Sequence, residues 1–455
     1  MAYIGNNLTV QQYSPQIAYF SGNGSTTAFT LPVGVVSSAQ IIVIVANVIQ
    51  NPSSAYTVSG TTLTFTSAPP SGTNNIWVEY TSLQTNTVAP SAGTVQNSSF
   101  GAVTAIPMTY GTIGAGDASL MKNRIINGAM QISQRNGTST VTPALYDYTI
   151  DRWQTQVTQS GKYTLAQSTS APAGFPNSML ITSTSAYSIT TTDCFDEKQY
   201  IEGFNCYDLA WGTANAKTVT LSFWVQSSLT GTFGGSIQNA NGNRSYPFSY
   251  TISSANTWTQ ASITISGDIT GTWMSSNNSV GMAVLFGLGV GSTLTNTAGS
   301  WAAGDYRSAT GATSVVGTNG ATFYITGVQL EVGSSATGFE YRQFQQELAL
   351  CQRYFSKSYD YSVVPGTANT ITGAVGIFSS LSSAFIALRW KVSMRATPTV
   401  TTYNYQGTAG YMSGGSYASL TATAYQTGTE GSNIASGTGN PGNDYYVNYA
   451  VTAEL

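Results

Sequence analysis

Lys217-Thr-Val-Thr-Leu-Ser-Phe-Trp-Val225 is the stretch that decides the fold class. Its valine, leucine and phenylalanine side chains return at every second position, and successive side chains of a β-strand point to opposite faces of a sheet. The stretch therefore predicts a strand with one face in a core. Residues 258–265, 282–286 and 323–331 continue the pattern, with turn-forming residues between them. Two facing antiparallel sheets are the natural solution for such a set.

The composition extends this expectation to the whole chain. With 455 residues the chain is too long for one compact core, so we expect several domains. Only 7% of the residues are charged, against about 25% in an ordinary soluble domain, yet the hydrophobic fraction of 41% suffices for a core. The formal net charge is −3 and there is no basic stripe, which argues against nucleic acid and anionic membranes as partners.

The residue types exclude several kinds of active site. The chain has no histidine, which excludes Ser-His-Asp and Cys-His catalysis and every His-ligated metal. The three cysteines, Cys194, Cys206 and Cys351, form no C-x-x-C pair, which argues against a zinc site. Cys194 and Cys206 could form a disulfide, but the odd number of cysteines favours free, buried thiols in a protein assembled in a reducing cytosol. We expect no metal and no cofactor.

Targeting signals are also missing from the pattern. The first residues lack the basic region and apolar stretch of a signal peptide. The longest apolar run, residues 41–46, is far shorter than the ~20 residues that span a bilayer. We therefore expect a product that is neither classically secreted nor inserted in a membrane.

The alternation and its interruptions predict the domain organisation. Tyr56–Phe65 alternates around Ser59-Gly60, which predicts a hairpin, whereas Phe344, Leu348, Cys351 and Phe355 have helical spacing. The predicted parts are an N-terminal β domain (1–85), a linker or neck (86–120), a jelly-roll β-sandwich (121–342), a helical connector (343–356) and a C-terminal β-sandwich (357–455). The fold class is thus all-β with one short helix.

Three groups of segments resemble tail-fibre proteins of tailed bacteriophages. The Glu-Leu-Ala-Leu-Cys-Gln-Arg-Tyr string at residues 347–354 is the most specific of them. The first group is similar to a small N-terminal domain of phage and cyanophage fibres, the second to jelly rolls akin to carbohydrate-binding modules, and the third to a recurrent phage C-terminal β domain. In that order the groups are residues 20–29, 51–65 and 68–70; then 123–135, 148–153, 220–225 and 327–333; then 339–342, 347–354 and 394–400.

This resemblance implies a homotrimer in the virion. The N-terminal domain would bind a tail, baseplate or adaptor protein, and the far end, the C-terminal tip or loops of the jelly roll, would bind a host-surface glycan. Related jelly rolls often hold a structural calcium, but Ala129-Met130 and Thr326-Gly327 stand at the comparable positions and supply no carboxylate.

The densest carboxylates could in principle form a glycosidase site. Two such groups roughly 5 to 10 Å apart would flank the scissile bond. The alternative, which we favour, is that they cap turns or pair with Lys198 and Arg152. The carboxylates in question are Asp147, Asp151, Asp193, Asp196, Glu197 and Glu202.

Aromatic residues are the expected glycan contacts, because sugar rings stack on Tyr and Trp while their hydroxyls bond to polar side chains. The sequence around these residues is rich in Gly, Ser and Thr, which indicates loops, and binding residues are often found in loops. Trp153, Trp224 and Trp258 are instead expected in the core. The predicted contacts are Trp301, Tyr306, Tyr403, Tyr405, Tyr411, Tyr417 and Tyr425.

The sequence thus predicts a non-enzymatic virion protein, a tail fibre that binds a host glycan after assembly in the host cytoplasm. Two alternatives stay open at this point. One is a tailspike that cleaves polysaccharide with paired carboxylates, although the parallel β-helix repeat typical of such spikes is not evident. The other is a baseplate or adaptor protein without a receptor.

Overall fold

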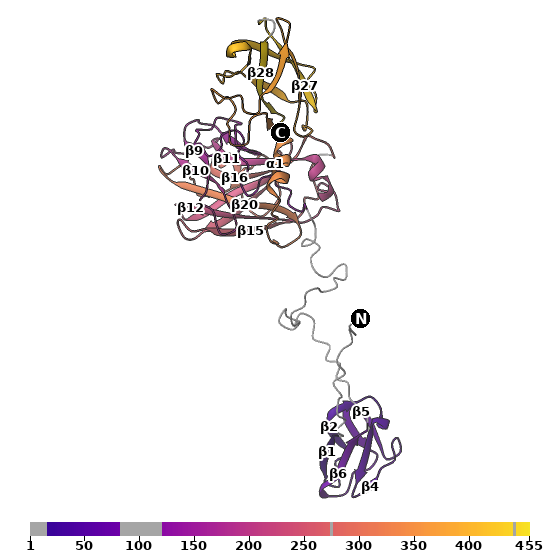
Figure 1. Ribbon diagram of the computed structural model, residues 1–455. Coiled ribbons are helices and arrows are strands. Elements are labelled where there is room, and N and C mark those ends of the chain that lie inside the picture. Colours follow the sequence, from indigo (N-terminus) through magenta and orange to yellow (C-terminus); the bar gives the residue numbers. More distant parts are fainter. Residues whose placement is uncertain (1–15, 82–120, 274–275, 440–442) are drawn as a thin grey trace. The chain divides into compact units, whose positions relative to one another are not determined.

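The computed structural model describes residues 16–81, 121–273, 276–439 and 443–455. The chain divides into two compact units, Met1–Pro107 and Met108–Leu455. In the second unit a β-sandwich, a helix and a further β domain follow one another along the chain (Figure 1). Nearly all regular structure in the described ranges is β, with a single α-helix, which confirms the predicted fold class. The predicted neck, residues 86–120, lies outside the described residues.

The N-terminal domain packs a four-stranded antiparallel sheet, in the order β1-β6-β3-β4, against the pair β2-β5. The alternation of Ile76, Val78 and Tyr80 places these three side chains in the core between the sheets. Leu63 and Phe65 meet them from the opposite side. The strands are β1 (Ile17–Gly22), β2 (Ala28–Val35), β3 (Ile41–Val45), β4 (Val48–Ile49), β5 (Tyr56–Phe65) and β6 (Gly72–Tyr80).

The hairpin predicted around Ser59-Gly60 is wrong. Strand β5 runs through both residues and pairs antiparallel with β2, with Gly60 opposite Val35. Gly60 has φ +58°, a conformation that a glycine adopts without strain, and no turn forms there. The alternation was correctly recognised, but the partner of the strand lies elsewhere in the chain.

The central sandwich, which begins after Met121, consists of a five-stranded sheet, β15-β12-β20-β10-β9, and a seven-stranded sheet, β18-β14-β13-β16-β11-β8-β7. Val219, Leu221, Phe223 and Val225 of β12 are fully buried between the sheets, as the alternation predicts. The strands are β7 (Tyr148–Ile150), β8 (Trp153–Val157), β9 (Tyr163–Ser168), β10 (Ser178–Ser183), β11 (Cys194–Glu202), β12 (Val219–Ser227), β13 (Gly231–Asn239), β14 (Arg244–Ile252), β15 (Thr259–Ile265), β16 (Val280–Val290), β18 (Ala302–Ala303) and β20 (Thr322–Val332), with β17 (Thr295–Asn296) and β19 (Ser308–Ala309) as a separate parallel pair.

Of the three tryptophans expected in the core, only Trp153 lies there. Trp224 is half-buried, because its neighbours Phe223 and Val225 take the inner face of β12 and alternation turns Trp224 outward. Trp258 is also half-buried and packs edge-on against Tyr324 of β20.

Helix α1 (Phe344–Gln352) joins the central sandwich to the C-terminal domain. Leu348 and Cys351 pack with Ile126, Ile132 and Tyr354 in a small core of their own. The helical spacing therefore predicts the helix and two of its buried positions. The predicted stripe extends too far, because the helix ends at Gln352 and Phe355 begins a strand.

The C-terminal domain is an eight-stranded antiparallel sheet built around one long strand, β28. Val447, Tyr449 and Val451 of β28 point into the core, the apolar face that their alternation predicts. Strands β21 and β24 pair with the second half of β28, whereas β22 pairs with the first half. The strands are β21 (Phe355–Lys357), β22 (Val375–Ser379), β23 (Phe385–Arg389), β24 (Thr399–Tyr403), β25 (Tyr411–Ser413), β26 (Ser419–Tyr425), β27 (Gly431–Ser436) and β28 (Asn443–Thr452).

The cysteines are free and buried, as predicted. Cys194 belongs to β11, Cys206 follows a short 3₁₀ turn, and Cys351 lies in α1. In the part of the chain that the structure describes, no helix has the length and apolar character needed to span a bilayer.

Candidate functional site

A cleft lies at the junction of the central sandwich and the C-terminal domain. Its floor is the outer face of β21, β28 and β24, opposite the face that forms the core. In the register of these strands Thr452 lies between Phe355 and Thr399, and Ala450 lies opposite Thr401. The short side chains of alanine and threonine leave the floor low, and that makes room for a ligand.

The cleft has a volume of about 270 Å³. Its lining combines two aromatic rings, three hydroxyls and one guanidinium, and it contains no carboxylate among the described residues. The lining residues are Arg135, Phe355, Pro365, Thr401, Tyr403, Ala450, Val451 and Thr452.

Arg135 is the charged wall of the cleft. Its guanidinium lies 3.8 Å from the ring centre of Phe355, a cation–π distance, and 2.9 Å from the carboxylate of Glu454. Its Nη1 atom is 3.7 Å from Asp151 and makes no hydrogen bond.

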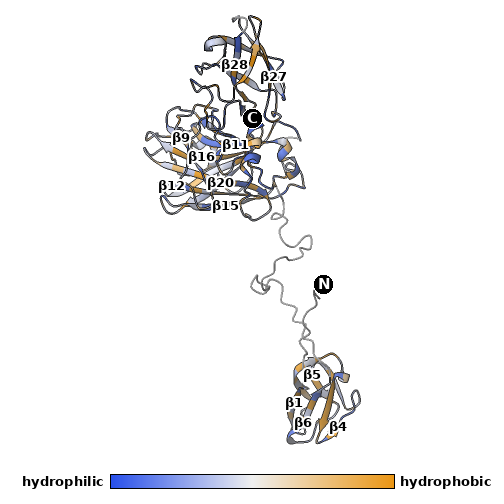
Figure 2. Cartoon of the chain, in the orientation of Figure 1, coloured by the Kyte–Doolittle hydropathy of each residue, from blue (hydrophilic) through white to orange (hydrophobic). Residues whose placement is uncertain are grey.

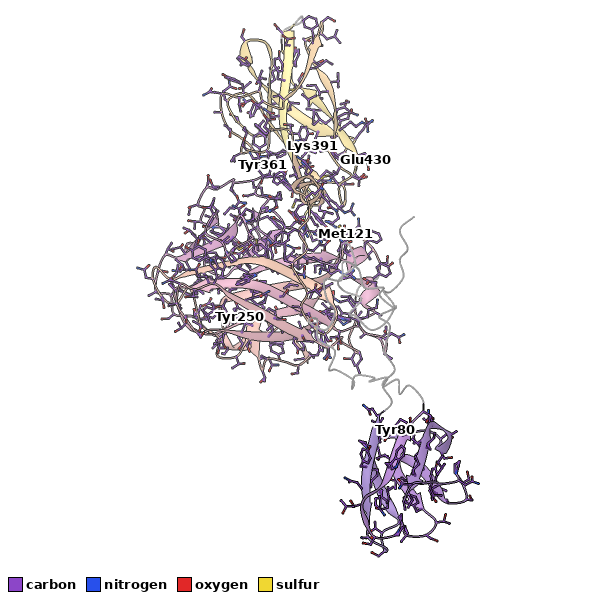
Figure 3. The ribbon with its side chains drawn as sticks, turned by 60° about the horizontal axis from the view of Figure 1, so that its bottom comes forward. Tyr80, Met121, Tyr250, Tyr361, Lys391 and Glu430 are labelled. Atoms are coloured by element: carbon purple, nitrogen blue, oxygen red, sulfur yellow. The ribbon has the colours of Figure 1, made fainter. Side chains whose placement is uncertain are left out.

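The opposite wall is held by a buried lysine. Nζ of Lys357 donates to the carbonyl oxygens of Gln134 (2.9 Å), Tyr361 (2.8 Å) and Val363 (2.6 Å). These contacts tie the loop that carries Pro365 to the segment that carries Arg135. Figure 3 labels Tyr361 at this junction.

Tyr403 is the aromatic side chain that β24 contributes. Its ring packs edge-on against Tyr359 at 6.0 Å, and the Tyr359 hydroxyl in turn accepts a hydrogen bond from the backbone N–H of Gly366. Burial raises the pKa of Tyr403, so its hydroxyl stays protonated and able to donate at neutral pH. The ring is thus fixed by its neighbours before any ligand arrives.

A network of buried ions holds the two sides of the cleft together. The Glu454 carboxylate bridges Arg135 and Arg152, and the Arg152 guanidinium stacks 3.5 Å above the Tyr354 ring. Arg395 adds hydrogen bonds to the carbonyl oxygens of Glu454 (2.8 Å) and Asn278 (2.7 Å). Because these groups come from both domains, the width of the cleft is set by the junction itself.

Of the seven predicted contacts, Tyr403 alone lines the cleft. Tyr405 and Tyr417 stack on each other at 4.1 Å with 17° between their planes, in the loop region between β24 and β26. Tyr411 lies exposed on β25, and Tyr425 packs edge-on against Phe385. The stacked pair is a second aromatic surface, separate from the cleft lining.

Trp301 and Tyr306 lie in the central sandwich. The Trp301 ring contacts Trp211 and Trp273 edge-on, at 5.2 and 5.4 Å, and its indole N–H donates to the Ser266 carbonyl at 2.8 Å. Tyr306 is half-buried, and its backbone carbonyl accepts from Gln238. The indole of Trp301 is therefore already engaged with protein on its polar edge.

The six carboxylates identified in the sequence all contact other protein groups. Lys198 and Arg152, the cations expected to pair with them, are not their partners. Arg152 pairs with Glu454, and the ammonium of Lys198 lies 3.1 Å from the side-chain oxygen of Gln156. Two of the acidic residues form ion pairs, Asp196 with Arg307 and Glu202 with Arg353. The other four accept hydrogen bonds: Asp147 from the Ala144 backbone, Asp151 from Gln134, Asp193 from Thr158, Tyr187 and Thr190, and Glu197 from Tyr163.

Several cleft residues escape prediction from the sequence. Arg135 and Phe355 are 220 positions apart, and only the fold brings them into contact. A signal for the floor existed, because Ala450 and Thr452 share the outward face of the last strand. This face alternates with the apolar face formed by Val447, Tyr449 and Val451.

Comparison with known proteins gives only solved structures of low similarity. No family model and no curated protein matches the sequence. Solved structures with similarity include the enzymatically active domain of a tailspike protein of bacteriophage CBA120 (15% identity, TM-score 0.27, 47% of this chain and 22% of that chain), a putative sugar binding protein from Bacteroides thetaiotaomicron (16%, 0.28, 46% and 100%) and a family 11 carbohydrate-binding module from Clostridium thermocellum (12%, 0.22, 44% and 99%). The matched part is thus less than a quarter of the tailspike chain.

Proposed function

We propose that this chain is a structural component of a bacteriophage virion, a homotrimeric tail fibre that attaches the particle to a host cell by binding a surface glycan. The N-terminal domain then joins the fibre to a tail, baseplate or adaptor protein. The resemblance of three groups of short segments to phage fibre proteins supports the virion assignment; the groups are residues 20–29, 51–65 and 68–70, then 123–135, 148–153, 220–225 and 327–333, then 339–342, 347–354 and 394–400. The protein is assembled in the host cytoplasm and acts on the particle.

The cleft is the observation that carries the glycan proposal. The Tyr403 ring offers a face or edge to the C–H groups of a sugar, while the hydroxyls of Thr401 and Thr452 offer hydrogen bonds to its oxygens. A volume of about 270 Å³ is at the small end for ligand sites, so the cleft suits a short saccharide end.

Binding without cleavage is supported by the placement of the acidic residues. A glycosidase needs two carboxylates that flank the sugar bond, and none of the described residues lining the cleft is acidic. The carboxylates nearest to it, Asp151 and Glu454, are buried and paired with Arg135. Weak single-site binding would be raised by avidity, since each trimer presents three clefts.

The test is binding of the full chain to lipopolysaccharide and capsular polysaccharide purified from bacteria to which it adheres. We expect Tyr403→Leu to weaken binding about 10-fold or more through loss of the ring contact. Tyr417→Leu, which alters only the stacked pair, should leave the affinity within about twofold. Thermal unfolding of both variants checks that they are folded.

Three results would contradict the proposal. Loss of binding in Tyr417→Leu but not in Tyr403→Leu would move recognition to the stacked pair. Release of reducing ends from the polysaccharide would mean cleavage. A mass in solution other than three times 47.8 kDa would exclude the trimer.

A further inference from the structure

The outer face of the N-terminal four-stranded sheet is apolar. Two rows of side chains cross it in register, and both point away from the core because their chain neighbours, such as Ala18 and Val78, are buried between the sheets. Figure 2 shows hydrophobic residues in orange along the strands of this domain. One row is Tyr19, Trp77, Ile44 and Ile49; the other is Ile17, Glu79 and Ile42.

This face is accessible in the isolated domain. The exposed fractions are 45% for Ile17, 59% for Tyr19 and 69% for Ile49, whereas Ile44 in the middle of its row is 5% exposed. An antiparallel sheet with one solvated face normally alternates hydrophobic-in and polar-out. A contiguous apolar face on a folded domain marks a surface that another molecule covers.

Glu79 identifies the kind of partner. It lies between Ile17 and Ile42 in the register of the sheet and is half-buried. It is the only Asp, Glu, Lys or Arg among residues 16–81, and the first basic side chain of the whole sequence is Lys122. Burying a carboxylate without a cation is strongly unfavourable.

A second copy of this domain cannot supply that cation. Two or three copies that met through this face would bring their Glu79 carboxylates together among apolar side chains, and no Lys or Arg of the domain could neutralise them. A different protein with one basic side chain opposite Glu79 satisfies both the charge and the apolar rows.

We propose that this face, defined by Ile17, Tyr19, Ile42, Ile49, Trp77 and Glu79, binds an apolar strip on another virion protein that carries a Lys or Arg paired with Glu79. The inference rests on the proposed function, because it takes the partner to be the protein to which the fibre is attached. It adds the surface, the chemistry of the partner and the residue that selects it.

The experiment adds the full chain to particles assembled without it and measures how much chain the particles retain. Wild type should be incorporated. Glu79→Gln should reduce the apparent affinity about 10-fold, and Glu79→Lys more than about 100-fold, because the second places two cations together. Ile49→Asp should abolish retention, since it puts a carboxylate in the apolar row.

Val36→Asp is the matched control, because Val36 is 94% exposed and lies between β2 and β3, outside the two rows. It should be incorporated like wild type. Suppressors of Glu79→Lys selected in growing phage should exchange a basic for an acidic residue in one other virion protein.

The outcomes separate the two proposals. Failure of wild-type chain to join the particles would refute the virion function. Retention of wild type together with Glu79→Lys and Ile49→Asp would refute this face alone. A drop in the solution mass of the free chain on Ile49→Asp would mean that copies of the chain cover the face, and would also overturn the inference.

Discussion

The carboxylate of Glu454 lies 2.9 Å from the guanidinium of Arg135, and the same carboxylate pairs with the fully buried Arg152. This bridge joins the last strand region of the C-terminal domain to the opening segment of the central sandwich. Because Arg135 is also a wall of the cleft, the ion pair links the stability of the junction to the shape of the candidate site.

Glu454→Gln should destabilise the second unit by about 3 kcal/mol, because it leaves the buried Arg152 guanidinium without its anion and removes one of the two anions beside Arg135. Urea unfolding followed by circular dichroism measures the change. Glu430→Gln is the control, since Glu430 is exposed and its carboxylate accepts a hydrogen bond from the Ser393 hydroxyl; it should stay within about 0.5 kcal/mol of wild type. Equal effects of the two substitutions would show that the bridge contributes nothing.

Glu197 should make the stability depend on pH. Burial in the core of the central sandwich raises its pKa from 4.5 to about 8, and its carboxyl accepts hydrogen bonds from Tyr163 (2.7 Å) and Thr155 (2.9 Å). The folded protein therefore holds a proton that the unfolded chain releases above pH 4.5. The contribution is complete below that pH and is lost as the pH rises toward 8.

Glu197→Gln keeps the shape and removes the titration, so it should be more stable than wild type at pH 8 by a few kcal/mol, on the order of 4, and nearly equal to it at pH 4. Thermal unfolding at intervals between pH 4 and 9 measures the difference. Parallel curves for the two proteins would contradict a protonated Glu197.

The three cysteines should be unreactive in the folded protein. Burial raises the pKa of Cys206 to about 12 and raises those of Cys194 and Cys351 well above their ordinary range, so little thiolate forms at neutral pH. A colorimetric thiol reagent should detect close to none of them under native conditions and all three in urea. A thiol that reacts rapidly without denaturant would be at odds with this packing.

Gly407 should be intolerant of a side chain. Its φ is +77°, and a Cβ built there would lie 2.1 Å from the carbonyl oxygen of Gly366, next to the cleft residue Pro365. Gly410 has a similar φ of +82° but no heavy atom within 4 Å of such a Cβ. Gly410→Ala should therefore cost only the backbone strain, about 1 kcal/mol, and Gly407→Ala about 1–3 kcal/mol more.

Calorimetric unfolding of the two alanine variants checks this difference. Gly407→Ala should also weaken polysaccharide binding at the cleft, whereas Gly410→Ala should not. If both variants bind and unfold alike, the contact between residues 407 and 366 has no influence on the cleft.

Local patterns predicted several strands and the face that each strand buries. The alternation of Leu221 and Phe223 identified β12, and that of Val447 and Tyr449 identified the core face of β28, because period-2 burial leaves a direct trace in sequence. The same rule, applied strictly, would have turned Trp224 outward. Its bulk suggested the core, but strand geometry decided its position.

Pairings between distant segments were not predictable in this way. The Tyr56–Phe65 strand has the alternation of a hairpin, yet its partner is β2, which a pattern internal to the strand cannot reveal. The cleft could not be predicted from local patterns either. Tyr403 was predicted from its aromatic character and loop context, whereas Arg135 and Phe355 meet only because the α1 connector returns the chain to the sandwich.

Because Glu79 is the single charged side chain of the N-terminal domain, the electrostatic part of its stability should depend little on salt. Within residues 16–81 there is no pair of charged side chains whose attraction salt could screen. Screening of charges by salt should therefore change the stability of this domain less than that of the second unit. The ion pairs around Glu454 lie in the second unit, where dissolved salt can weaken the attraction between charged side chains.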